Sequence, residues 1–72
     1  MQKMTLKAAR VNVDMTAKEV ADIVGIHQQT LLKYEHDSSK IPFDLLQRLS
    51  KIYGISTDYI FLGKKYDLKR TL

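Results

Sequence analysis

Residues 16–34, TAKEVADIVGIHQQTLLKY, decide the fold, because their pattern predicts two short helices joined by a tight turn. Thr16 and Glu19 fit a capping box, in which the hydroxyl accepts from the Glu19 amide while the carboxylate reaches back. Gly25 lies in the turn, where a residue free to take positive φ costs little. Two crossed helices would bury the apolar positions of this stretch, which are Val20, Ala21, Val24, Ile26, Leu31 and Tyr34.

The second predicted helix begins near His27 or Gln28 and has one outward face. Residues three and four apart align on a helix surface, so this face holds Gln28, Gln29, Leu32 and Lys33. Such a spacing is typical of a helix-turn-helix unit, whose second helix enters the major groove of DNA.

Length and composition narrow the class of protein. The 72 residues allow one domain, near the lower size limit for folding on core burial alone. The net charge of +4 favours a polyanionic partner without deciding it. There is no cysteine, no metal-ligand cluster and no nucleophile–base pair, so we expect no enzyme activity, no metal ion, no cofactor and no small-molecule substrate. No apolar run approaches a membrane span, so we expect a soluble protein outside the membrane.

Three more helices are predicted around the central pair. Thr5 caps the first of them, which runs to about Asn12. Pro42 suits the first turn of the next, and Gly54 is placed to end it in a left-handed cap. The last predicted helix spans 57–62.

Residues 1–63 therefore form one predicted all-α domain of five helices, and residues 64–72, KKYDLKRTL, form a basic C-terminal tail. A frayed end is the default for such a tail, while an arm along the DNA backbone and a docking segment also fit its charge. The start at Met1 and the lack of a linker favour a complete chain.

Arg10 falls close to the inner side of the first predicted helix. A buried guanidinium needs a carboxylate partner, and Glu35, at the end of the second helix of the central pair, is the best candidate. We expect a structural ion pair between these residues rather than a catalytic or base-reading arginine, because buried charges are usually paired.

The run from Leu6 to Gly63 resembles the lambda-repressor-like (XRE-type) helix-turn-helix domains of Cro and phage repressors. Three segments, in this order and at these separations, carry the resemblance: LKAAR, TAKEVADIVGIHQQTLLKYE and IPFDLLQRLSKIYGISTDYIFLG. Domains of this family pair an Arg in the first helix with a Glu that closes the recognition helix. Arg10 and Glu35 match that pair.

The chain departs from the family pattern at three positions. Ala17 stands where a phosphate-holding Gln usually begins the second helix. Asp14 and Asp37 stand where Gly is common, and Asp enters the left-handed region less easily than Gly.

The resemblance implies a sequence-specific transcriptional regulator from a temperate phage or related mobile element, acting in the bacterial cytoplasm on the nucleoid. It would bind double-stranded operator DNA as a homodimer and serve a lysis–lysogeny switch. Such domains often pair through the region that here holds Tyr59, Phe61 and Tyr66. For Tyr59 and Phe61 a place in the core is the simpler expectation, since aromatic side chains are usually internal. The alternative is a small helix-turn-helix modulator, an anti-repressor, that forms a heterocomplex with a larger repressor.

Gln28 and Gln29 are the predicted base-contacting residues, because a Gln amide both donates to and accepts from adenine in the major groove. Lys33, one turn later, is predicted to reach a guanine edge or a phosphate. Leu32 is apolar on an outward face, and a thymine methyl or a protein partner would bury it equally well.

Predicted phosphate contacts flank this face and fix register without reading sequence. They combine backbone amides at helix starts, aided by the helix dipole, with polar and basic side chains. The candidates are Thr16, Ala17, Lys18, His27, Thr30, Ser38, Ser39, Lys40 and Phe43. For His27, capping of the recognition helix is the simpler role.

Overall fold

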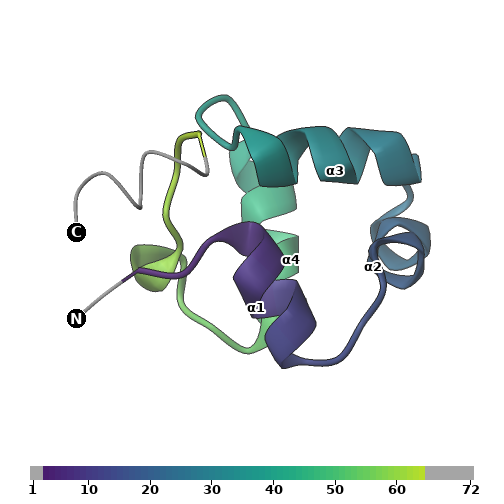
Figure 1. Cartoon of the computed structure of the whole chain (residues 1–72), viewed down its shortest axis with the longest axis horizontal. Helices are drawn as coiled ribbons and strands as arrows, with labels where there is room; N and C mark the ends of the chain where they lie inside the picture. The colour runs from purple at the N-terminus through teal and green to yellow at the C-terminus, as the bar shows by residue number, and fades with distance from the viewer. Residues whose placement is uncertain (1–2, 65–72) are drawn as a thin grey trace.

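Four α-helices and one 3-10 turn build the part of the chain that this computed structural model describes, residues 3–64. The helices are α1 (Leu6–Asn12), α2 (Ala17–Val24), α3 (Gln28–His36) and α4 (Phe43–Tyr53), and the turn, η1, is Thr57–Tyr59. Figure 1 shows α3 lying along one side of the molecule, with α2 seen nearly end-on beside its first turn and α1 in front of α4. The predicted all-α class is confirmed.

Apolar side chains from every helix and from the segment after η1 meet in one core. The fully buried members are Leu6, Val20, Leu31, Leu49 and Ile60. Ile26 and Tyr34 are partly buried and pack against this core. The apolar positions expected inside the central helix pair therefore all lie in or on the core.

Local signals in the sequence set the helix ends. The Thr5 hydroxyl accepts a hydrogen bond from a first-turn amide of α1. Thr16 and Glu19 form the complete capping box at the start of α2. Gly25 and Gly54 end α2 and α4 in the left-handed conformation, with φ of 75° and 67°. These predictions are confirmed.

Three residues near helix ends refine the sequence prediction. Pro42 has φ −59° and ψ 138°, so it precedes α4 as its cap residue instead of lying in its first turn. Asp14 adopts a positive φ of 59°, the conformation that the family's glycine supplies there. Asp37 is extended, with φ −145°, so its position needs no glycine.

The predicted fifth helix, 57–62, is wrong beyond its first turn, because the helix stops at Tyr59. The Met4 amide donates to the Tyr59 carbonyl, and the Phe61 amide donates to the Met4 carbonyl, both at 2.7 Å. The backbone around Ile60 thus pairs with the N-terminal segment in a short parallel bridge instead of continuing helical bonding. In this extended conformation the Ile60 side chain is buried in the core, which stabilises the domain.

The segment after Ile60 continues along the far end of α3. It lies between the N-terminal stretch and the loop that joins α3 to α4 (Figure 1). Lys64 forms an antiparallel bridge with Asp37, the residue that follows α3. The rest of the predicted tail, which includes Tyr66, lies outside the described residues.

One buried ion pair connects α1 to α3. Arg10 Nε donates to Glu35 Oε2 at 2.7 Å, and Arg10 Nη2 donates to Glu35 Oε1 at 3.1 Å. Arg10 Nη1 also donates to the Met15 carbonyl, at 3.0 Å, in the connector between α1 and α2. The hydrogen bond to Glu35 raises the pKa of Arg10, so the guanidinium stays charged although it is 9% exposed. The pair expected from the sequence is present, and it fixes α3 against α1.

Tyr53 lies near this ion pair at the end of α4. Its hydroxyl is buried and has no hydrogen-bond partner among the described residues. The pKa of Tyr53 is raised from 10.0 to about 12. Burial of the hydroxyl is the largest cause, the negative charge of Glu35 adds to it, and the positive charge of Arg10 partly opposes it. The Tyr53 ring therefore stabilises the core by packing, while its buried hydroxyl without a partner lowers the stability of the fold.

We expect Glu35→Gln to lower the free energy of unfolding by about 3 kcal/mol, because the substitution leaves the buried Arg10 charge uncompensated. The double variant Arg10→Met, Glu35→Leu removes both charges and should be less destabilised than Glu35→Gln. Urea denaturation of the three proteins measures this. A double variant less stable than the single one would contradict the account of Glu35 as the counter-charge that Arg10 requires.

We expect Tyr53→Phe to keep or raise stability at pH 7 by up to about 1 kcal/mol, because it removes an unbonded buried hydroxyl. The unfolded chain releases the tyrosine proton near pH 10, while the native state holds it to about 12. Stability carried by this group therefore falls as the pH rises from 10 to 12. Tyr53→Phe should lessen that fall in thermal melts, whereas Tyr59→Phe, at an exposed ring, should not.

Candidate nucleic-acid interface

The outward face of α3 is formed by the residues that the sequence pattern predicts. Gln28, Gln29, Leu32 and Lys33 are all exposed, while Leu31 on the opposite side is fully buried. Gln28 is the first residue of α3, so both glutamines stand in the first turn. Amide N–H groups in a first turn have no acceptor within the helix, and this end of α3 therefore presents donors from both side chains and backbone.

The start of α2 is a second polar region. The Thr16 amide donates to Glu19 Oε1 at 2.9 Å, and Thr16 Oγ1 accepts from the Glu19 amide at 3.1 Å. These bonds lower the pKa of Glu19, so a carboxylate already offsets part of the positive end of the helix. The Ala17 side chain is buried, which leaves only its amide to face a phosphate. Exposed Lys18 is the group here that adds positive charge.

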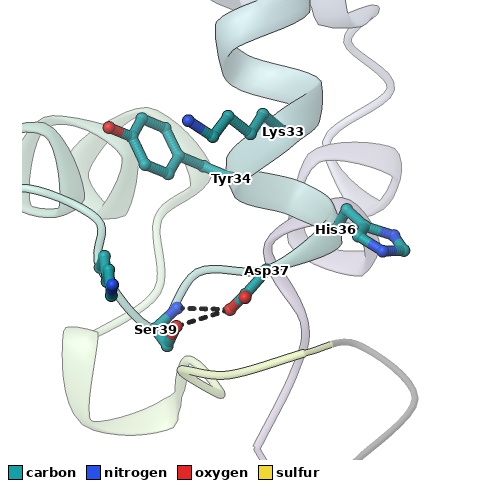
Figure 2. Close-up of a pocket in the computed structure, with 6 residues that line it drawn as sticks. Lys33, Tyr34, His36, Asp37 and Ser39 are labelled. Carbon is teal, nitrogen blue, oxygen red and sulfur yellow. Dashed lines mark hydrogen bonds between the residues drawn. The ribbon is translucent and has the colours of Figure 1, made fainter.

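A hollow of about 410 Å³ lies between the end of α3 and the loop that follows it. Its lining residues are Lys33, Tyr34, His36, Asp37, Ser39 and Lys40. Figure 2 shows the Lys33 and Tyr34 side chains on the same side of α3, with His36 turned the other way. The hollow thus brings two lysines from different elements to one place, which the sequence spacing alone did not predict.

Ser39 and Asp37 bond to each other within this hollow (Figure 2). Asp37 Oδ1 accepts from the Ser39 hydroxyl at 2.7 Å and from the Ser39 amide at 3.0 Å. The two bonds, with the hydroxyl first, lower the pKa of Asp37. The amide and the hydroxyl of Ser39 therefore both donate to Asp37. Lys40, another predicted phosphate contact of this loop, is exposed and carries a positive charge.

Ser38 requires a correction, because its side chain has a structural role. The residue is 4% exposed, and its hydroxyl bonds to the main chain of Phe61 and Gly63. Donation to a DNA phosphate would break these bonds, so we remove Ser38 from the phosphate-contacting residues. No sequence pattern indicated this role, because the bonds join positions 23 and 25 residues apart.

The remaining predicted contacts differ in exposure. His27 is the cap residue of α3 by position, but its side chain makes no capping hydrogen bond, so the expected capping role of the imidazole is wrong. Thr30 is half-buried in the first turn of α3. Phe43 begins α4 and its ring is 62% exposed. Of these three, His27 keeps a polar side chain fully available at the head of α3.

Tyr34 is the residue of this surface that the sequence analysis missed. Its helical position assigned it to the core, and it does pack there in part. The ring also forms one wall of the hollow beside Lys33. The neighbouring Lys33 and Tyr34 could have indicated this position from the sequence, because a tyrosine side chain packs its ring against apolar groups and exposes its hydroxyl to solvent.

Other classes of site are not seen in residues 3–64. No group of three or more His, Cys, Asp or Glu side chains is placed there to hold a metal ion. Within the same residues, every helix is too short or too polar to cross a membrane.

The crossed pair α2 and α3, the left-handed turn at Gly25 and the polar outer face of α3 define a helix-turn-helix protein. The model of the helix-turn-helix family matches residues 6–60, which is most of the chain. The chain therefore belongs to this family, in its lambda-repressor-like (XRE-type) form, as its resemblance to Cro and phage repressors implied.

Named relatives come from Bacillus subtilis (strain 168). The HTH-type transcriptional regulator ImmR is 42% identical over 59 residues, which are 82% of this chain and 46% of that protein. The SPbeta prophage-derived uncharacterized HTH-type transcriptional regulator YonR is 33% identical over 69 residues, 93% of this chain and 64% of that one. The uncharacterized HTH-type transcriptional regulator YobD is 34% identical over 55 residues, 76% and 49% respectively. The chain thus spans about half to just under two thirds of the length of these relatives.

Proposed function

We propose that this protein is a sequence-specific DNA-binding transcriptional regulator of the Cro and repressor type, which places α3 in the major groove of its operator. The observation that carries the proposal is the exposed face of Gln28, Gln29, Leu32 and Lys33 on a helix that a buried ion pair holds in place. A rigidly held helix with hydrogen-bonding side chains in its first turn is what major-groove recognition requires.

Gln28 and Gln29 supply the base contacts in this proposal. A carboxamide pairs with adenine N6 and N7, so each glutamine favours an A·T pair at its position. Lys33 reaches a guanine edge from the next turn, and Leu32 packs on a thymine methyl beside the glutamines.

Phosphate contacts hold α3 in register on either side of these bases. Lys18 and the amides of Thr16 and Ala17 meet one strand at the start of α2. Lys40 and the amide of Phe43 meet the backbone at the other end of α3, where the hollow brings Lys40 and Lys33 together. His27 and Thr30 add polar groups near the head of α3. This arrangement gives backbone contacts at both ends of the recognition helix, with base contacts between them.

A homodimer fits a second feature of the surface. Phe43 and Leu62 are 62% and 47% exposed, and they line a hollow of about 430 Å³ with Ile60 and Phe61. Lys3 and Asp58 line the same hollow and carry opposite charges. A two-fold axis would bring each charge near its opposite on a second copy and cover the apolar rings. The half-sites would then lie about one helical turn apart on DNA.

The relatives support the regulatory setting of the proposal. All three names describe transcriptional regulators, and one is described as prophage-derived. We therefore place the protein on the nucleoid in the cytoplasm of a bacterium, as a regulator from a temperate phage or related mobile element. Control of a lysis–lysogeny decision is the process that such an element requires.

We expect Gln28→Ala and Gln29→Ala each to reduce discrimination between the operator and single-base variants by about 1–3 kcal/mol at the contacted position, because each removes a bidentate pair with adenine. Sites selected from random duplexes, followed by titration in gel shifts at fixed salt, measure this. Gln47→Ala on exposed α4 is the matched control and should bind like the wild type.

Two results would contradict the proposal. Unchanged discrimination in both glutamine variants would remove α3 from base contact. A wild-type protein that binds no duplex, yet forms a stable complex with a longer repressor, would favour the anti-repressor alternative, with exposed Leu32 as part of the protein contact.

We expect Leu62→Glu to shift the protein from dimer to monomer and to lower its affinity for a two-half-site duplex by more than about tenfold, since it places a charge in the apolar interface. Sedimentation velocity gives the oligomeric state. Val11→Glu changes an apolar side chain on α1 that is also exposed, and it should leave the dimer intact. A Leu62→Glu protein that remains dimeric would place the dimer contact elsewhere.

A further inference from the structure

The Ser38 hydroxyl joins two segments that are distant in sequence. It accepts a hydrogen bond from the Gly63 amide at 3.0 Å, and its own proton lies between the carbonyls of Phe61 and Gly63, at 3.2 and 3.3 Å. The Ser38 amide adds a fourth contact by donating to the Gly63 carbonyl at 3.0 Å. With 4% exposure, the side chain has no access to solvent that would replace these partners.

The same residue begins the turn that carries Lys40. The Ser38 carbonyl accepts from the Ile41 amide at 3.2 Å, which closes a four-residue turn. Ser39 and Lys40 are the two central residues of this turn. Every hydrogen-bonding group of Ser38 is thus used, with the amide and hydroxyl fixed to residues 61–63 and the carbonyl holding the turn.

Gly63 is adapted to this contact. Its φ is 151°, and a Cβ at this position would lie 3.1 Å from the Phe61 ring, closer than ordinary van der Waals contact. Residues with a side chain rarely adopt this φ, so glycine allows residue 63 the backbone conformation in which its amide and carbonyl both bond to Ser38. The segment that follows η1 therefore binds the loop after α3 through hydrogen bonds from its main chain to Ser38.

We propose that Ser38 is a positioning residue for DNA binding, which acts through Lys40 and so determines the affinity of the backbone contact at the end of α3. The inference rests on the proposed function. A lysine on an unrestrained loop loses backbone freedom when it meets a phosphate, and that cost weakens binding. The Ser38 bonds restrict the loop before DNA arrives, so Lys40 meets the phosphate from a preformed turn.

The role of Ser38 differs from that of the residues beside it. Within residues 3–64, the hydrogen bonds of Ser39 go to Asp37, two positions earlier in the same loop. Ser38 instead fixes the loop to the body of the domain, because residue 61 is tied through its amide to the Met4 carbonyl at 2.7 Å. The Ser38 hydroxyl, together with the main-chain bond from the Ser38 amide to the Gly63 carbonyl, therefore holds the turn that carries Lys40 against the body of the domain.

The experiment is a double-variant cycle of Ser38→Ala and Lys40→Ala, with operator affinity measured at a low temperature where circular dichroism shows every protein folded. Ser38→Ala should weaken binding about tenfold, equivalent to ~1.4 kcal/mol. The double variant should bind within about twofold of Lys40→Ala alone, since two residues that act through one contact are not additive. The salt dependence of log K should also flatten in Ser38→Ala, by up to about 0.9 for one lost phosphate contact.

Thr5→Ala is the matched control for general destabilisation. It too removes one hydroxyl hydrogen bond, at 3.1 Å, but at the start of α1. A cap substitution costs about 1 kcal/mol of stability, and we expect it to leave the operator affinity and the salt slope unchanged. Ser38→Ala with the affinity of the wild type, or with a loss that adds fully to that of Lys40→Ala, overturns the inference while the proposed function stands.

Amide hydrogen exchange in the wild type tests the same coupling without a substitution. If the hydrogen bonds between Ser38 and residues 61–63 favour DNA binding, bound DNA must stabilise these bonds in return. Saturating operator should slow exchange of the Gly63 amide, which bonds to Ser38, more than that of the Phe61 amide, which bonds to Met4 on the other edge. Equal exchange at Gly63 with and without operator overturns the inference. Absence of operator binding by the wild type overturns the proposed function first.

Discussion

The ion pair between Arg10 and Glu35 is the interaction on which the geometry of this small domain depends. A domain of 72 residues buries little apolar surface, and α3 contributes few fully buried side chains to the core. The guanidinium compensates by binding α3 through two hydrogen bonds and the α1–α2 connector through a third. One side chain therefore joins α3 to α1 and to the connector between α1 and α2.

The ion pair lies on the inner side of α3 and leaves the outer face of the helix exposed. Leu31 and Glu35 attach the helix from its inner side, while Gln28, Gln29 and Lys33 are exposed on its outer side. The attachment of α3 to the core and its exposed polar face are thus carried by different residues of one helix.

The sequence predicted the features that depend on neighbouring residues. The capping box at Thr16 and the left-handed ends at Gly25 and Gly54 follow from contacts within one or two turns. The Arg10 pairing was also predictable, because a buried charge has few possible partners. The early end of the last helix and the burial of Ser38 were not predictable, because both depend on backbone pairing with segments more than 20 residues away. Such pairing involves main-chain atoms, which carry no residue-specific signal.

The hydrogen bonds between Gly63 and Ser38 lie partly outside residues 6–60, which the family model matches. The residues that pack together as one domain therefore extend past that match. A chain cut after Ile60, where the family match ends, would contain the residues of all four helices. It would lack the main-chain groups of residues 61–63 to which the Ser38 hydroxyl and amide bond. In this chain the folded domain thus includes the extended residues 61–63, which follow the last helix and bond to the loop after α3.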